Sequence, residues 1–159
     1  MSATKDLAKR CALMWYSLTP EMARQWFSED AVYENRCDQG PTVRGPREIY
    51  AILDAYRQMC NRFEGKLLNI VEEGDVVLLE REEVTFLKNG ASVTVPVMDS
   101  FLMKDGKISV WREYWDLATL TKKLLVGHSG EEATEIYQQY NLGNSQHDAK
   151  PKVVDYYCR

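Results

Sequence analysis

The sequence predicts a single α+β domain in which helices come first and a run of antiparallel strands follows. The length of 159 residues fits one hydrophobic core. Over roughly the first sixty residues, apolar side chains recur at the three- and four-residue spacing of amphipathic helices. The period then changes to two across four segments that glycine-containing turns separate. This separation of helices from strands along the chain is typical of the α+β class.

Two helices are expected at the start of the chain. The first is predicted over residues 4–17, where apolar side chains recur on one side of a helix. A second begins at Thr19 and Pro20 and continues to Phe27. Threonine is a good N-cap and proline suits the first helical position, so this pair marks a helix start.

A short strand is predicted over residues 31–35 and a loop over residues 36–45. Gly45 and Pro46 then open a third helix, which has the strongest amphipathic pattern of the chain. Its apolar positions are Ile49, Ile52, Leu53, Tyr56, Cys60 and Phe63.

Alternating patterns predict four strands, at residues 64–73, 76–87, 91–103 and 107–116. The dipeptides that separate them are typical of hairpin turns, namely Gly74-Asp75, Asn89-Gly90 and Asp105-Gly106.

Helical spacing returns over residues 117–125 and 131–140. The domain is therefore assigned to residues 1–141. The polar segment 142–159 is expected to be a mobile tail.

The composition argues against several functional classes. The net charge of -4 and the scattered basic residues argue against nucleic-acid binding. No window approaches the roughly 20 apolar residues of a membrane helix. The four cysteines form no CxxC pair, which favours a reduced, cytoplasmic protein. The two histidines, His128 and His147, lie in polar segments, so a His-rich metal site is not expected.

The predicted strand 76–87 places charge among apolar residues. Because strand side chains alternate, Arg81 and Glu83 share a face with Val77, Leu79 and Thr85. If that face is buried, its charges must be paired. A solvated edge with alternating charges would give the same pattern, and this strand alone leaves both interpretations open.

The last predicted strand favours the buried interpretation. Glu113 shares a face with Ser109, Trp111 and Trp115, so two tryptophans flank the carboxylate. Burial would raise the pKa of Glu113 unless an arginine held it down. Because a guanidinium group is fork-shaped, Arg81 can hold two carboxylates at once.

The turn before this strand determines which residue faces Glu113. A three-residue turn over Lys104-Asp105-Gly106 places Val97 opposite Glu113, whereas a two-residue turn places Met98 there. We favour the first, because it gathers a valine-lined wall beside the tryptophans. The residues on that wall are Val95, Val97, Asp99, Phe101 and Met103.

Three segments carry a family resemblance. EDAVYEN at 29–35, LEREEVTF at 79–86 and DGKISVWREYWDL at 105–117 resemble the limonene-1,2-epoxide hydrolase family, with similarity from about residue 5 to residue 125. The resemblance implies a cystatin-like cone, as in SnoaL-type enzymes and nuclear transport factor 2, in which a curved mixed β-sheet packs on N-terminal helices around a central pocket. It also implies a homodimer through the outer sheet face, for which Leu78, Val84 and Phe86 are suited, although the same pattern would also suit packing against a helix.

The resemblance also implies roles for five residues. Glu83 matches the acid that protonates the epoxide oxygen, Glu113 the base for water, and Arg81 the bridge between them. Tyr33 and Asn35 match the residues that fix the water. The implied reaction turns a mostly apolar epoxide into a vicinal diol without a metal or cofactor.

Two departures from the family pattern stand out. Both family aspartates are glutamates here, and Asp99 replaces a residue that is usually small. Each glutamate reaches about 1.5 Å further by ordinary bond lengths. Arg36 is either the counter-charge of Asp99 or a solvent-facing residue. These departures keep a SnoaL-like cyclase or isomerase as an alternative, and a non-catalytic ligand-binding module as a further one.

Other side chains are expected to contact a small apolar or moderately polar substrate. Tyr56 and Cys60, one turn apart on the third predicted helix, either line the pocket or pack in the core. The full set of predicted substrate contacts is Asp99, Trp111, Trp115, Val95, Val97, Thr85, Tyr56, Cys60 and Arg36.

Overall fold

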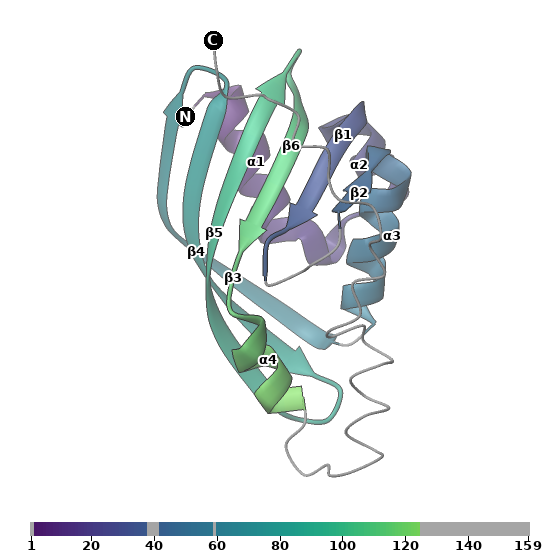
Figure 1. The fold of residues 1–159 in the computed structure, drawn as a ribbon, viewed down its shortest axis with the longest axis vertical. Helices are drawn as coiled ribbons and strands as arrows, with labels where there is room; N and C mark the ends of the chain where they lie inside the picture. Colours follow the sequence, from purple (N-terminus) through teal and green to yellow (C-terminus); the bar gives the residue numbers. More distant parts are fainter. Residues whose placement is uncertain (1, 38–41, 59, 125–159) are drawn as a thin grey trace.

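The computed structural model describes residues 2–37, 42–58 and 60–124. Helices occupy the first part of the chain and one mixed sheet occupies most of the rest (Figure 1). The helices are α1 (Ala3–Met14), the 3-10 helix η1 (Trp15–Ser17), α2 (Pro20–Trp26), α3 (Gly45–Arg57) and α4 (Leu117–Leu124). The strands are β1 (Phe27–Asn35), β2 (Thr42–Arg44), β3 (Cys60–Glu73), β4 (Val76–Leu87), β5 (Ser92–Lys104) and β6 (Lys107–Tyr114).

The sheet has the strand order β2-β1-β6-β5-β4-β3. The pair β1 and β6 is parallel, and the other neighbouring pairs are antiparallel. In Figure 1 the sheet curves, α1 crosses behind its central strands, and α3 lies beside β1 and β2. The predicted α+β class, with a curved mixed sheet on N-terminal helices, is confirmed.

Capping side chains fix the starts of α1 and α2. The Ser2 hydroxyl accepts a hydrogen bond from the Lys5 N–H at 3.1 Å. Thr19 accepts one from the Met22 N–H at the same distance, with Pro20 in the first turn. Caps of this kind contribute about 1 kcal/mol each, since they satisfy N–H groups that have no partner within the helix.

The third helix ends earlier than its amphipathic pattern predicts. It stops at Arg57, and Cys60 and Phe63 belong to β3. A register shift in β3 between Cys60 and Arg62 lets Cys60 and Phe63 both turn toward the interior, although they are three residues apart. A spacing of three is typical of a helix, so the bulge produced a helical pattern within a strand.

Strand β2 was predicted to be loop. Its three residues pair with β1, with Val43 opposite Tyr33. A strand this short carries too little alternation to be recognised from sequence.

The predicted register between β5 and β6 is wrong by two residues. Asp105 and Gly106 both have positive φ and form a two-residue turn, so Lys104 faces Lys107. A register shift then follows, because Leu102 faces Val110 whereas Met103 faces Ile108. Ser109 is the extra residue of this bulge. Ile108 therefore occupies the buried position on the Trp111 face that was predicted for Ser109. Asp99, not Val97, therefore lies opposite Glu113.

Two apolar clusters lie on the inner face of the sheet. The larger combines α1, η1, α2 and α3 with the start of β4, the end of β5 and parts of β1, β3 and β6, around Trp111 and Phe101. The smaller consists of Leu87, Val93, Val95 and Val97, with Trp115, Leu117 and Leu120 packed against it.

Among the described residues, no helix has the length and apolar character needed to cross a membrane. The helix predicted at 131–140, the tail at 142–159 and both histidines lie outside the described residues.

Candidate active site

Strand β4 supplies the centre of the site. Its inner face alternates as predicted, with Val77 and Leu79 buried and Arg81 completely removed from solvent. Glu83 and Thr85 continue this face toward the end of the strand. An unpaired buried charge would cost several kcal/mol, so the surroundings of Arg81 determine whether the fold is stable.

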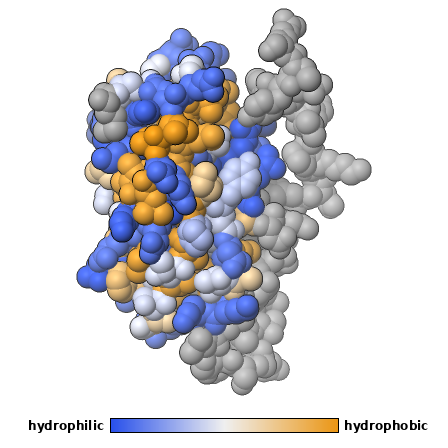
Figure 2. Space-filling view, turned by 90° about the vertical axis from the view of Figure 1, so that its left-hand side faces the viewer, coloured by the Kyte–Doolittle hydropathy of each residue, from blue (hydrophilic) through white to orange (hydrophobic). Residues whose placement is uncertain are grey.

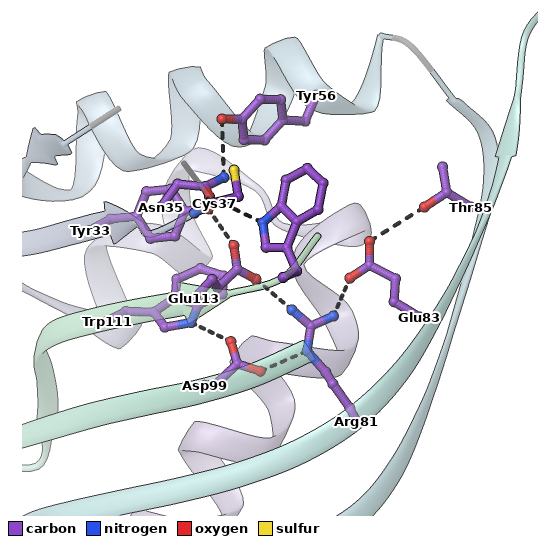
Figure 3. A network of polar contacts seen from close by, with 11 residues as sticks. Tyr33, Asn35, Cys37, Tyr56, Arg81, Glu83, Thr85, Asp99, Trp111 and Glu113 are labelled. Atoms are coloured by element: carbon purple, nitrogen blue, oxygen red, sulfur yellow. Dashed lines mark hydrogen bonds and ion pairs between the residues drawn. The ribbon is translucent and has the colours of Figure 1, made fainter. Parts of the chain in front are cut away.

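Three carboxylates surround the Arg81 guanidinium group (Figure 3). Nε donates to Asp99 Oδ2 at 2.8 Å, Nη1 donates to Glu83 Oε2, and Nη2 donates to Glu113 Oε1 at 2.5 Å. Each nitrogen therefore has its own carboxylate. Burial alone would lower the pKa of Arg81, but the charges of the three carboxylates raise it well above its usual value.

Glu113 lies on the side of this cluster that faces β1. Its Oε2 accepts a hydrogen bond from the Tyr33 hydroxyl of β1. The pKa of Glu113 is raised to about 8. Burial raises it most, Arg81 lowers it, and the charges of Asp99 and Glu83 also raise it. The expected arginine is present, yet the pKa remains raised, because three carboxylates share one guanidinium group.

An aromatic stack supports the cluster from the interior. The Trp111 ring lies 5.6 Å from Phe101 and 4.7 Å from Tyr33, measured between centroids. Its Nε1–H donates to Asp99 Oδ1 at 2.7 Å. Burial raises the pKa of the Tyr33 hydroxyl well above its usual value, so Tyr33 is a neutral hydrogen-bonding group in this site.

Asn35 joins β1 to α3 and to the end of β6. Its Oδ1 accepts hydrogen bonds from Trp115 Nε1 at 3.1 Å and from the Cys37 N–H at 3.2 Å. Its Nδ2 donates to the Tyr56 hydroxyl at 3.3 Å. The amide is therefore held in one orientation, directly opposite Glu113, its register partner across β1 and β6.

The exposed fractions of the side chains indicate where a substrate could approach. The Glu83 side chain is 15% exposed and that of Glu113 is 9%, whereas Arg81 and Asp99 are at 0%. The site is therefore accessible from the Glu83 side. Thr85 lies there as well, with its hydroxyl 3.4 Å from Glu83 Oε1.

Several predicted substrate contacts occupy other positions. Arg36 is exposed and pairs with Glu34 at 2.9 Å, so it is not the counter-charge of Asp99. Asp99 and Trp111 are buried on the inner side of the cluster, where they support its polar groups. Cys60 is on β3, yet it stays beside Tyr56, whose carbonyl oxygen lies 3.4 Å from its Sγ.

The remaining predicted contacts form a wall. Val95 and Val97 are buried in the smaller apolar cluster, and Trp115 packs against them. Leu117 and Leu120 of α4 cover the same cluster and were not predicted as site residues. Cys37 was also missed. The amphipathic pattern of α4 was a usable signal for the leucines, whereas nothing in the local pattern indicated Cys37.

Comparison with known proteins gives consistent results. A family model described as the limonene-1,2-epoxide hydrolase catalytic domain matches residues 18–126. The epoxide hydrolase EphG of Mycobacterium tuberculosis is 35% identical over 101 residues, which are 62% of this chain. The chain spans about 64% of the length of that relative.

Solved structures share the fold. An LEH-like epoxide hydrolase of M. tuberculosis superposes with a TM-score of 0.60 at 29% identity, over 79% of this chain and 91% of that one. A protein from Jannaschia sp. CCS1 described as a SnoaL-like polyketide cyclase gives 0.68 at 17% identity, over 76% and 90%. The second likeness concerns the fold alone. The family match spans more than half of the chain and contains strands β1 to β6, and the protein therefore belongs to the limonene-1,2-epoxide hydrolase family.

Proposed function

We propose that this protein is an epoxide hydrolase that opens a mostly apolar epoxide by one-step attack of water. The observation that carries the proposal is the pair of glutamates, Glu83 and Glu113, bridged by the buried Arg81. Epoxide opening needs a proton at the oxygen while carbon is attacked, so an acid and a base must act in the same site. Two carboxylates on one guanidinium group provide that arrangement.

The proposed reaction assigns each proton. Glu113 accepts a proton from water as the water oxygen forms a bond to an epoxide carbon. The bond between this carbon and the ring oxygen breaks, and its electron pair goes to that oxygen, which takes a proton from Glu83. The product is a vicinal diol. A proton then returns from Glu113 to Glu83 before the next turnover.

Tyr33 and Asn35 are proposed to hold the water. Tyr33 already contacts Glu113, and the amide of Asn35 has a second N–H besides the one that Tyr56 accepts. Because the pKa of Glu113 is raised to about 8, the fraction of ionised base increases with pH through the neutral range. Activity is therefore expected to increase over that range.

The substrate is proposed to place its apolar part against the smaller apolar cluster. Val95 and Val97 lie on the strand that carries Asp99, and Trp115 and Leu117 cover them. This wall continues directly from Glu83 along the accessible side of the site. Apolar walls with a few polar groups are typical of small-molecule sites.

Isotope labelling tests the proposed reaction. Under single-turnover conditions in ¹⁸O water, the diol is expected to carry one ¹⁸O atom, because water attacks the epoxide directly. A covalent ester at either glutamate would instead give unlabelled diol in the first turnover. Mass spectrometry of the product distinguishes these outcomes.

Cyclisation or isomerisation is the second candidate function. The specific observation is that Asn35 Oδ1 is already occupied by Trp115 and Cys37, which leaves fewer contacts for a water molecule. In that case a substrate group would attack in place of water. An unlabelled product with the mass of the substrate would support this candidate and would contradict hydrolysis.

We propose, in addition, a homodimer through the outer face of the sheet. Leu78 lies opposite Val71, and Met98 lies opposite Tyr114, and all four are at least 40% exposed. The face shown in Figure 2 carries a hydrophobic area with hydrophilic residues around it. Of the residues predicted for this role, Leu78 is exposed, whereas Val84 and Phe86 are half-buried.

Charge placed on this face tests the dimer. The double substitution Leu78→Lys and Met98→Lys is expected to give monomers in analytical ultracentrifugation, because like charges would face each other across the two-fold axis. Met14→Lys is the control, since Met14 is similarly exposed on α1, away from the sheet. A wild-type chain that sediments as a monomer would contradict the proposal.

The predicted cytoplasmic location stays a prediction.

A further inference from the structure

Asp99 has two hydrogen-bond partners that can only donate. Oδ2 accepts from Arg81 Nε, and Oδ1 accepts from Trp111 Nε1. Neither an arginine side chain nor an indole N–H can accept a hydrogen bond. A carboxylic acid or an amide at position 99 would therefore point one of its own hydrogen-bond donors at either the Arg81 N–H or the Trp111 N–H.

Glu83 and Glu113 have partners of a different kind. Each uses one oxygen for Arg81 and has the other beside a hydroxyl group, Thr85 for Glu83 and Tyr33 for Glu113. A hydroxyl group can donate to a carboxylate or accept from a carboxylic acid. Both glutamates can therefore gain or lose a proton without losing a hydrogen-bond partner, whereas Asp99 cannot.

We propose that Asp99 is a positioning residue that stays ionised as the fixed counter-ion of Arg81. By this assignment the resting site keeps its exchangeable proton on Glu83 and Glu113. The inference rests on the proposed function, because it concerns the acid and the base of that reaction. It also gives a role to the carboxylate that departs from the family pattern.

The charges within the cluster support this assignment. Among the described residues that face it, Arg81 is the one cation, and three carboxylates bond to it. If all three were ionised, the buried cluster would carry two net negative charges. Burial raises the pKa of four further titratable groups around it, which are therefore neutral: Cys11 of α1, Tyr33 of β1, Tyr56 of α3 and Cys60 of β3. A proton shared by the glutamates reduces this net negative charge from two to one.

A consequence for pH follows from the position of Asp99. Its charge cancels that of Arg81, so Arg81 is less able to favour ionisation of the two glutamates. The raised pKa of Glu113, to which the charge of Asp99 contributes, is consistent with this effect. In a variant that is neutral at position 99, the charge of Asp99 no longer raises the pKa of Glu113 and Arg81 still lowers it, so Glu113 would ionise at lower pH.

Two neutral variants at position 99 test the inference. In Asp99→Ala, the vacated space can take a water that accepts from both Arg81 and Trp111. Asp99→Asn keeps the shape, and its oxygen can accept from one of these donors while its NH2 group faces the other. The pH profile of kcat/KM is expected to move to lower pH by about one unit or more in each variant that folds. The matched control is Glu80→Gln, which removes a carboxylate next to Arg81 that bonds Asn69 instead. Its profile is expected to stay in place.

A second measurement needs no substrate. In the wild type, stability is expected to decrease as pH rises from about the usual glutamate pKa of 4.5 toward 8, because Glu113 keeps its proton when folded. In Asp99→Ala that decrease should be confined to a lower pH range. Lower activity with an unchanged profile and an unchanged stability curve would overturn the inference and leave the proposed function intact. Altered stability curves in a protein that turns over no epoxide would contradict the proposed function alone.

Discussion

The Glu113→Gln variant is expected to lose turnover by at least about 100-fold, and by up to about 10,000-fold, because the proposed base is removed. The glutamine can keep both native contacts. Its Oε1 can accept from Arg81, and its amide can donate to the Tyr33 hydroxyl, which then acts as acceptor. Single-turnover kinetics at pH 8 measure the loss, and substrate-analogue titration measures retained binding.

The control for Glu113→Gln is Glu64→Gln, whose side chain is 57% exposed and pairs with Arg62. It should retain wild-type rates. Glu113→Gln is also expected to gain stability relative to the wild type as pH rises from about 4.5 to about 8. Over that window the wild type loses the stability that the protonated Glu113 contributes. Near-wild-type turnover in Glu113→Gln would contradict the catalytic assignment and favour a ligand-binding module.

Replacing Arg81 with methionine is expected to cause the largest loss of stability. The change leaves Asp99, Glu83 and Glu113 with no positive partner in a cluster whose side chains are between 0% and 15% exposed. Removing one partner of a buried ion pair costs about 3–5 kcal/mol. The expected loss at pH 8 is at least in this range, measured by urea unfolding.

The pH dependence identifies the cause of that loss. At pH 5 the carboxylates are more readily protonated, so the Arg81→Met variant should recover part of its stability. The matched control is Arg10→Met, which removes an exposed ion pair with Asp6 and should cost less than about 1 kcal/mol. Arg81→Lys should also be destabilised, because an ammonium group cannot direct separate, planar bonds to three carboxylates. Equal stability at pH 5 and pH 8 in Arg81→Met would contradict this explanation.

Local sequence patterns predicted much of the site, because each pattern depends only on residues that are close together in the sequence. Alternation along β4 placed Arg81, Glu83 and Thr85 on the face of Val77 and Leu79, and the structure has them there. The glycine-containing turns identified the hairpins between the long strands. The three motifs identified the family, which the match over residues 18–126 confirms.

Positions that depend on a second element were not predictable in the same way. The bulge at Ser109 sets the register that puts Asp99 opposite Glu113, and no periodicity in either strand shows it. The bulge near Cys60 placed Cys60 and Phe63 three residues apart on the inner face, a spacing that is typical of a helix.

By itself the sequence determined the fold class, the family and the face on which Arg81, Glu83 and Glu113 lie, because hydrophobic periodicity and short motifs are local properties. The tertiary structure decided that Arg81 holds three carboxylates instead of two. That number depends on strand register and on the burial of Asp99 beside Trp111, which arise only when β4, β5 and β6 pair. It also determines where the proton of the site is held, because one guanidinium charge cannot balance three buried carboxylates.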